Sequence, residues 1–222
     1  MKISSKIIGV SGQKENGKST TCDILRDKYG YTLVSFGAAI KDTVAARYYG
    51  EDYHKYRRLL EGAPDDEESR KWREEPDKFW TKEMSNSASY LAVFPDGMVT
   101  PRRLLQYEGT DVTKVHIKVD FWISTVKKFL LAHPGEKIAF VDTRYPDEVE
   151  FIQSLGGQLL WVQRFDPEWI DCPLEDMKER FPLVHPSEYA WMKYQEEYIP
   201  LDNRSICEGW KEELVANLEK CF

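Results

Sequence analysis

The sequence predicts an α/β fold in which helices cover both faces of a parallel β-sheet, and three observations lead to this class. Short apolar runs alternate with helical segments along much of the chain. The first run leads directly into a glycine-containing loop and then a helix. The middle third is instead charged and poor in strand signals, as expected of an insertion on such a core.

Local patterns define the expected elements in order. The first apolar run is β-branched, which suits a strand buried on both faces. Glycine at position 30 is a suitable stop for the helix that follows the loop. Strands are expected at 7–10, 31–36, 137–141 and 158–163. Helices are expected from 19 to Gly30 and at 38–49, 148–155 and 209–221.

The charged middle of the chain predicts solvated helices and loops, because it mixes both charge signs with tryptophans. Pro101 suits the first position of a helix, and Gly109 breaks the pattern. Apolar residues then recur at helical spacing over 121–130. We therefore expect a single domain, 1–222, that carries a mainly helical inserted region at 50–125.

Composition and charge exclude several classes of protein. The chain has 222 residues, 41 % hydrophobic and 31 % charged, which suits a globular domain. A net charge of −7 disfavours a nucleic acid polymer as partner, and no apolar run is long enough to span a bilayer. The four cysteines lack metal-ligand spacing, and the short apolar N-terminus does not suit a signal peptide. These features predict a cytoplasmic protein without a membrane partner.

The strongest motif is GQKENGKS at 12–19, which matches GxxxxGK[ST] between a strand and a helix. In such a loop, backbone N–H groups surround the phosphates of a nucleotide and the helix N-terminus adds partial positive charge. Lys18 would reach the β- and γ-phosphates, and the Ser19 hydroxyl would bind Mg²⁺. The motif predicts binding of a nucleoside triphosphate but does not define a reaction.

A second candidate position follows the strand at 137–141. Asp142 stands at the carboxyl end of that strand, where a parallel sheet faces its ligand crevice. Asp142 could hold Mg²⁺ or an acceptor, and Arg144 could neutralise a transferring phosphoryl group. The alternative is an Asp–Arg pair that only closes a turn.

A third candidate is the helix that begins near Pro101. The guanidiniums of Arg102 and Arg103 could bind a phosphate, and the Gln106 amide could pair with a base edge. The alternative is a pair of solvated arginines. Lys14 and Lys41 are likewise exposed lysines unless the fold brings them to a phosphate, and we assign no histidine a proton-transfer role.

Several stretches, in order along the chain, resemble the phage deoxynucleoside monophosphate kinases of the P-loop kinase superfamily. They cover nearly the whole chain except about 50–100, and RRLLQ–GTD together with DTR–E–GG–VxR is far more specific than the motif at 12–19. The matching stretches are GQKENGKST, FGAAIKD (36–42), RRLLQYEGTD (102–111), the run from 140 to 164, HPSE (185–188) and Asn203.

The resemblance implies a P-loop kinase fold with a lid at 165–190, a dNMP-binding insertion, and Mg²⁺ as cofactor at Ser19 and Asp142. The implied ATP-binding residues are Lys14, Glu15, Asn16, Gly17, Lys18, Ser19, Thr20 and Asn203. The implied dNMP-binding residues are Lys14, Ile40, Lys41, Arg102, Arg103, Gln106, Gly109, Thr110, Asp111, Trp122, Asp142, Arg144 and Glu148. The implied catalytic residues are Lys18, Arg102, Arg103, Asp142, Arg144 and Arg164.

The resulting hypothesis is transfer of the ATP γ-phosphoryl group to a dNMP, which would supply a phage with dNTP precursors in the host cytoplasm. The resemblance also implies a homodimer as a further expectation. Two alternatives stay open at this stage. One is a P-loop kinase that acts on hydroxymethylated pyrimidines in DNA, and the other is an NTPase or switch module that phosphorylates nothing.

Overall fold

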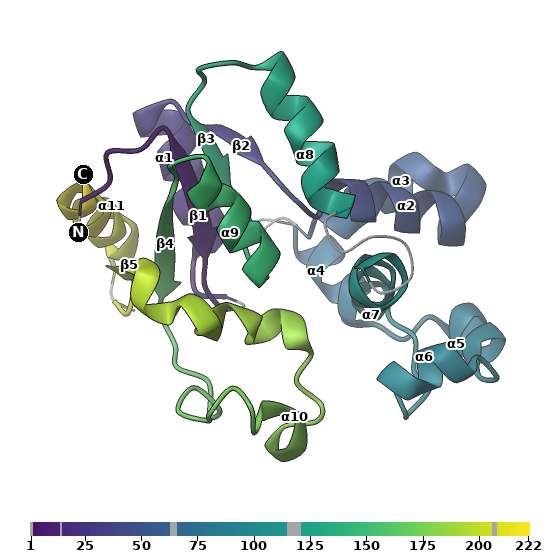
Figure 1. Cartoon of the computed structure of the whole chain (residues 1–222). Coiled ribbons are helices and arrows are strands. Elements are labelled where there is room, and N and C mark those ends of the chain that lie inside the picture. The colour runs from purple at the N-terminus through teal and green to yellow at the C-terminus, as the bar shows by residue number, and fades with distance from the viewer. Residues whose placement is uncertain (1, 14, 63–65, 115–120, 206–207) are drawn as a thin grey trace. The chain divides into compact units, whose positions relative to one another are not determined.

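The computed structural model describes residues 2–13, 15–62, 66–114, 121–205 and 208–222, and Figure 1 labels its elements. The chain forms two compact units. The first joins Met1–Phe36 to Val126–Phe222, and the second is Gly37–Thr125. The second unit therefore begins before residue 50, where we expected the inserted region to start.

The first unit contains a five-stranded parallel sheet, so the predicted α/β class is confirmed. Its strand order is β2-β3-β1-β4-β5. The register places Ile8 beside Ala139 and Gly9 beside Leu159. The strands are β1 (Ile7–Ser11), β2 (Thr32–Val34), β3 (Ile138–Phe140), β4 (Gln158–Gln163) and β5 (Tyr198–Asp202).

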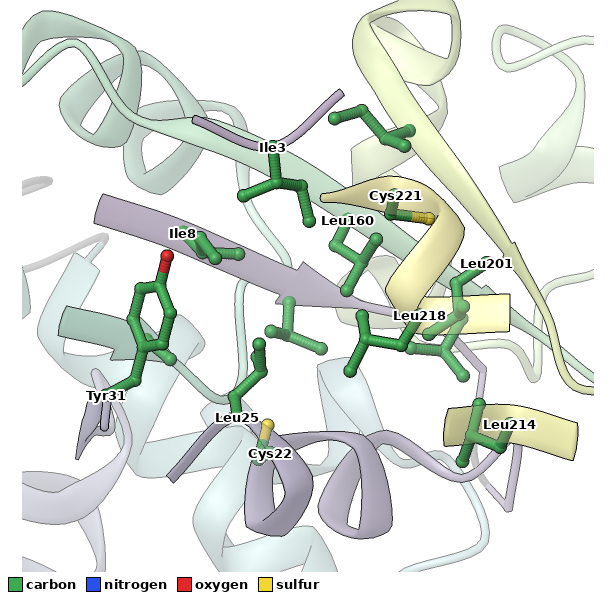
Figure 2. Packing of buried hydrophobic residues seen from close by; sticks show 14 residues of the cluster. Ile3, Ile8, Cys22, Leu25, Tyr31, Leu160, Leu201, Leu214, Leu218 and Cys221 are labelled. Carbon is green, nitrogen blue, oxygen red and sulfur yellow. The ribbon is translucent and has the colours of Figure 1, made fainter. Parts of the chain in front are cut away.

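One face of the sheet is covered by α1 (Lys18–Tyr29) and α11 (Trp210–Cys221). Figure 2 shows Leu25, Leu214 and Leu218 from these helices packed in one cluster with Ile8 and Leu160 from the strands. Full burial of each such side chain contributes about 1.5–3 kcal/mol. This cluster fixes the start of α1 against the end of β1.

The opposite face is covered by α9 (Pro146–Ser154), with Phe151 packed against Phe140. Gly9 of β1 faces this helix, and a Cβ atom at Gly9 would lie 2.6 Å from Cδ1 of Ile152. Since real Cβ atoms do not approach so closely, glycine at this position permits the packing of α9. The expected coverage of both sheet faces is therefore confirmed.

The C-terminal part of the first unit continues from β4 through the expected lid segment. This segment contains α10 (Met177–Arg180) and the 3-10 turn η3 (Pro186–Glu188), and it is followed by η4 (Ala190–Glu197). It has its own apolar cluster around Trp169, Cys172, Met177 and Tyr189. Among the described residues, no helix has the length and apolar character needed to cross a membrane.

The second unit is built from short helices around a core that includes Val44, Leu60, Tyr90 and Leu104. Polar residues cap several of these helices: Asp66, Asp77, Ser87 and Thr100 each accept a hydrogen bond from a first-turn N–H group. The helices are α2 (Ala38–Tyr49), α3 (Tyr53–Glu61), α4 (Glu67–Glu74), α5 (Lys78–Met84), α6 (Ala88–Val93) and α7 (Pro101–Gln106), with the 3-10 turn η1 (Gly50–Asp52) after α2 and the start of α8 (Phe121–Ala132) at the end.

Pro101 starts α7 as predicted, but the expected break at Gly109 is wrong. The chain continues from α7 into a π-helix, η2 (Tyr107–Lys114), that contains Gly109. A Cβ atom at Gly109 would lie 2.8 Å from Cδ1 of Ile40, and the Trp122 indole donates to the Gly109 carbonyl at 2.9 Å. Glycine is therefore needed here for close packing inside a helix.

Candidate nucleotide-binding site

The loop that follows β1 lies at the carboxyl edge of the sheet, where two neighbouring strands send their connections to opposite faces. β1 leads to α1 on one face, and its neighbour β3 leads to α9 on the other. Open α/β sheets bind ligands in the crevice at such a switch point. The fold therefore places 12–13, 15–19 and 142–144 at the expected ligand edge.

The backbone of this loop has left-handed residues that turn it toward α1. Glu15 has φ +66° and Gly17 has φ +94°. Gly17 is the N-cap of α1, and among the described residues no side chain caps this helix and none in its first turn is acidic. The first-turn N–H groups, next to Ser19 and Thr20, are thus suited to an anion. Lys14 lies outside the described residues.

Lys18 folds back over the same loop. Its Nζ atom donates to the carbonyl oxygens of Gly12 and Gln13, each at 2.7 Å. An ammonium group so held is already at the loop, and phosphate oxygens could replace the carbonyls as its acceptors. Lys18 therefore lies where the motif requires a phosphate ligand.

Two asparagines hold the loop from the protein interior. Asn16 is fully buried, and its Nδ2 lies 3.3 Å from the carbonyl of Val162 while its Oδ1 accepts from the N–H of Phe165. Asn203 donates from Nδ2 to the Asn16 carbonyl at 2.7 Å. Both side chains are thus engaged in the loop's support, so a ligand would meet Asn16 through its backbone.

Asp142 and Arg144 follow β3 as predicted. Asp142 accepts from Ser35 Oγ at 2.6 Å and from the Phe36 N–H at 2.9 Å, which fixes the carboxylate beside the end of β2. Arg144 Nη1 pairs with Glu188 at 2.9 Å. Burial disfavours the charged guanidinium, but the Glu188 and Asp142 carboxylates outweigh it and raise the pKa of Arg144.

Glu148, predicted to line the acceptor site, is buried and caps a turn. One carboxylate oxygen accepts from the N–H groups of Arg144 at 2.7 Å and Tyr145 at 3.0 Å. This capping fixes the backbone from which the Arg144 side chain extends. Arg164, after β4, places its guanidinium 5.0 Å from the ring centroid of Trp210.

Ser35 and Glu188 also contact residues of this site, although the sequence patterns do not indicate them. Ser35 directly follows β2, but the strand expected at 31–36 includes it, so Ser35 was expected inside a strand and not at its end. Glu188 lies 44 positions from its partner Arg144, and no local signal marks that pair. The long separation explains why sequence alone missed it.

The remaining predicted acceptor residues lie in the second unit. Arg103 makes a two-contact ion pair with Asp96, at 2.6 and 3.0 Å, donates to the Met98 carbonyl and lies over the Phe94 ring. Arg102 lies 3.6 Å from Glu74. Neighbouring residues on a helix point in directions about 100° apart. The two guanidiniums thus have different partners in this structure.

Other second-unit predictions gather around the π-helix. Ile40 packs on Gly109, and Trp122 is buried and bonds to the same glycine. Lys41 pairs with Glu61 at 2.6 Å, while the side chains of Gln106, Thr110 and Asp111 are partly exposed along α7 and η2. The predicted acceptor residues other than those at 142–148 and Lys14 therefore lie together in this unit.

The donor groups of the first unit fit Mg²⁺. The Ser19 side chain is exposed at the start of α1, and the Asp142 carboxylate lies beyond the carboxyl end of β3, the strand next to β1. Mg²⁺ is usually held by one or two carboxylates together with waters and substrate phosphates. The described part of the chain has no group of three or more His, Cys, Asp or Glu placed to hold a metal. The donor set suits an ion that arrives with a nucleotide.

The five-stranded parallel sheet, its flanking helices and the glycine loop at its switch point are consistent with the P-loop kinase fold. One curated relative points in the same direction. The chain is 25 % identical over 171 residues to a protein of Acanthamoeba polyphaga mimivirus named "Putative deoxynucleotide monophosphate kinase", and the match covers 71 % of this chain and 74 % of that protein. No protein-family model matches the chain. This distant similarity supports a nucleotide kinase function.

Proposed function

We propose that this protein is a deoxynucleoside monophosphate kinase that transfers the γ-phosphoryl group of ATP to a dNMP. The observation that carries the proposal is the loop at 12–19, where left-handed Glu15 and Gly17 lead into an uncapped helix N-terminus and Lys18 folds over the loop. The name of the mimivirus relative supports the choice of acceptor.

In this proposal the first unit binds the donor nucleotide. The N–H groups at 15–20 and the Lys18 ammonium bind the ATP phosphates. Ser19 and Asp142 would hold Mg²⁺, which neutralises phosphate charge when bound. Arg144 and Arg164 supply further positive charge near the carboxyl edge of the sheet.

The acceptor needs no general base. A phosphate oxygen of the dNMP is already ionised at pH 7, attacks the γ-phosphorus and forms the new P–O bond. The bond from that phosphorus to the β–γ bridging oxygen breaks, and ADP leaves with the electron pair. Arg102, Arg103 and Gln106 are the proposed ligands of the acceptor's phosphate and base.

The direct test is coupled ADP release by the purified protein with each canonical dNMP, with 5-hydroxymethyl-dCMP and with no acceptor. We expect turnover to require an acceptor. The Lys18→Met variant should retain the fold but lose this acceptor-dependent turnover. Equal turnover with and without acceptor would instead indicate an NTPase or switch module. Phosphorylation of hydroxymethylated DNA, with salt-sensitive DNA binding, would indicate a kinase that acts on hydroxymethylated pyrimidines in DNA.

A further inference from the structure

Glu188 lies at the end of the 165–190 segment, in the 3-10 turn η3, and contacts two parts of the candidate site. We propose that Glu188 is a positioning residue that orients the Arg144 guanidinium for phosphoryl transfer. The proposal rests on the kinase function proposed above, and it gives a role to a residue that the sequence patterns did not assign to the site.

The side chain of Glu188 makes the first contact. Its Oε1 accepts from Arg144 Nη1 at 2.9 Å, and the two side chains are 16 % and 33 % exposed. A partly desolvated, charge-assisted bond of this kind is stronger than a surface ion pair and fixes direction. It therefore limits where the Arg144 guanidinium can lie.

The backbone of Glu188 is itself held firmly. Its carbonyl accepts from Gln13 Nε2 of the phosphate loop at 3.1 Å and from the Trp191 indole at 2.9 Å. Trp191 stacks on Trp161 of β4 with ring centroids 3.6 Å apart. The Glu188 carboxylate thus extends from a point anchored to both the sheet and the loop.

Arg144 is consequently fixed at both ends. Glu148 accepts from its backbone N–H at 2.7 Å, and Glu188 binds its guanidinium. A free arginine side chain loses much rotamer freedom when it must bind a ligand, and a preorganised charge avoids that loss during the reaction. Glu188 should therefore favour the transition state more than it favours ground-state binding.

A competing role for Glu188 predicts a different kinetic effect of its removal. If Glu188 instead sequestered Arg144 from phosphate, its removal would release the guanidinium and lower the KM of a substrate. The two roles can be separated by comparing kcat with KM in Glu188→Ala and Glu188→Gln.

For the positioning role we expect Glu188→Ala to lower kcat about tenfold or more, while both KM values stay within about twofold, as for a displaced catalytic group. Glu188→Gln should restore part of the loss, because it keeps an oxygen acceptor. In an Arg144→Ala background, Glu188→Ala should cause no further loss. Glu179→Ala, at an exposed position of the same segment, is the matched control.

A second measurement does not depend on activity. Phenylglyoxal labelling, mapped by mass spectrometry, should modify Arg144 faster in Glu188→Ala than in the wild type, with exposed Arg70 unchanged as internal reference. Unchanged Arg144 labelling, or a lowered KM with unchanged kcat, would overturn the inference. Absence of acceptor-dependent turnover in the wild type would instead refute the kinase proposal, and the labelling would still decide the Glu188–Arg144 contact.

Discussion

Asn203 donates a hydrogen bond from Nδ2 to the backbone carbonyl of Asn16 at 2.7 Å, which links the end of β5 to the loop between β1 and α1. The Asn203 N–H also donates to the Gln163 carbonyl at 2.8 Å, so the residue is fixed to β4. Asn203 is only 2 % exposed. These contacts make Asn203 a support of the loop, whereas the family resemblance implies that Asn203 binds ATP itself.

We predict that Asn203→Ala weakens binding of Mg²⁺·ATP and of Mg²⁺·triphosphate in the same proportion, because both bind through the loop that Asn203 supports. The loss of a buried hydrogen bond should also destabilise the protein by about 1–2 kcal/mol. Isothermal titration of the wild type and the variant with the two ligands measures how much the affinity for each ligand falls. Asn217→Ala is the control, since Asn217 bonds the neighbouring Asp202 carbonyl away from the loop. A loss for ATP alone would show an adenine contact.

Gly17 should not tolerate a side chain. It has φ +94°, and an added Cβ would lie 2.3 Å from Nδ2 of Asn203. Gly30 has φ +71° with nothing within 4 Å of its added Cβ, so it shares only the left-handed backbone. Both alanine variants should lose about 1–2 kcal/mol of stability for that reason. Only Gly17→Ala should also lose ATP binding.

Chemical denaturation and ATP titration of the Gly17→Ala and Gly30→Ala variants check this expectation. Equal ATP affinity in the two would mean that the Gly17–Asn203 contact is unimportant. Addition of Asn203→Gly to Gly17→Ala should relieve the clash between the new Cβ and the Asn203 side chain. The double variant still lacks the hydrogen bond from Asn203 to the Asn16 carbonyl.

The sequence predicted the parts of the fold that depend on local signals. The apolar runs that form β1, β3 and β4, and the glycine-containing loop between β1 and α1, follow from patterns of a few neighbouring residues. The strand β5 was missed because its short sequence YIPLD contains Pro200. Proline is tolerated there because β5 is an edge strand, which only the strand order reveals.

Side-chain partners distant along the chain could not be predicted. Asn203 and Asn16 are 187 positions apart, and it is the arrangement of the sheet that brings the Asn203 amide to the loop. Arg103 and Asp96 are instead seven positions apart, so their ion pair lay within reach of a local analysis. Ser35, which directly follows the strand beside β3 and bonds Asp142, was missed because the predicted strand at 31–36 extended past it.

The Cys22 thiol should be inert in the native protein. Burial, with the nearby Asp142 and Asp23 carboxylates, raises its pKa from 9.0 to about 12. The neutral thiol therefore favours the native state below pH 9, and this contribution is lost as pH rises from 9 toward 12. At pH 8, iodoacetamide should leave Cys22 unmodified until denaturant is added, as mapped by mass spectrometry. Cys172 and Cys221, also buried, serve as references; native labelling of Cys22 alone would refute the prediction.

Alanine variants of Arg102 and Arg103 should differ in their effect on stability, although both residues were predicted to bind the acceptor. Arg103 is held by Asp96, the Met98 carbonyl and the Phe94 ring, so Arg103→Ala should lower the free energy of unfolding by about 1–2 kcal/mol. Arg102 Nη1 lies 3.6 Å from the half-exposed Glu74, and an ion pair of this kind contributes about 0–1 kcal/mol, so Arg102→Ala should destabilise the protein less than Arg103→Ala while raising the KM for dNMP.

Asp96→Ala separates the two roles of Arg103, because it removes the partner and keeps the guanidinium. If Arg103 mainly supports the second unit, Asp96→Ala and Arg103→Ala should lower stability equally and leave the KM for dNMP near that of the wild type. If Arg103 also binds the acceptor's phosphate, only Arg103→Ala should raise that KM, with ATP affinity unchanged in both variants. Denaturation curves and steady-state kinetics on the four proteins decide between these outcomes, and a loss confined to ATP affinity would contradict the acceptor role of both arginines.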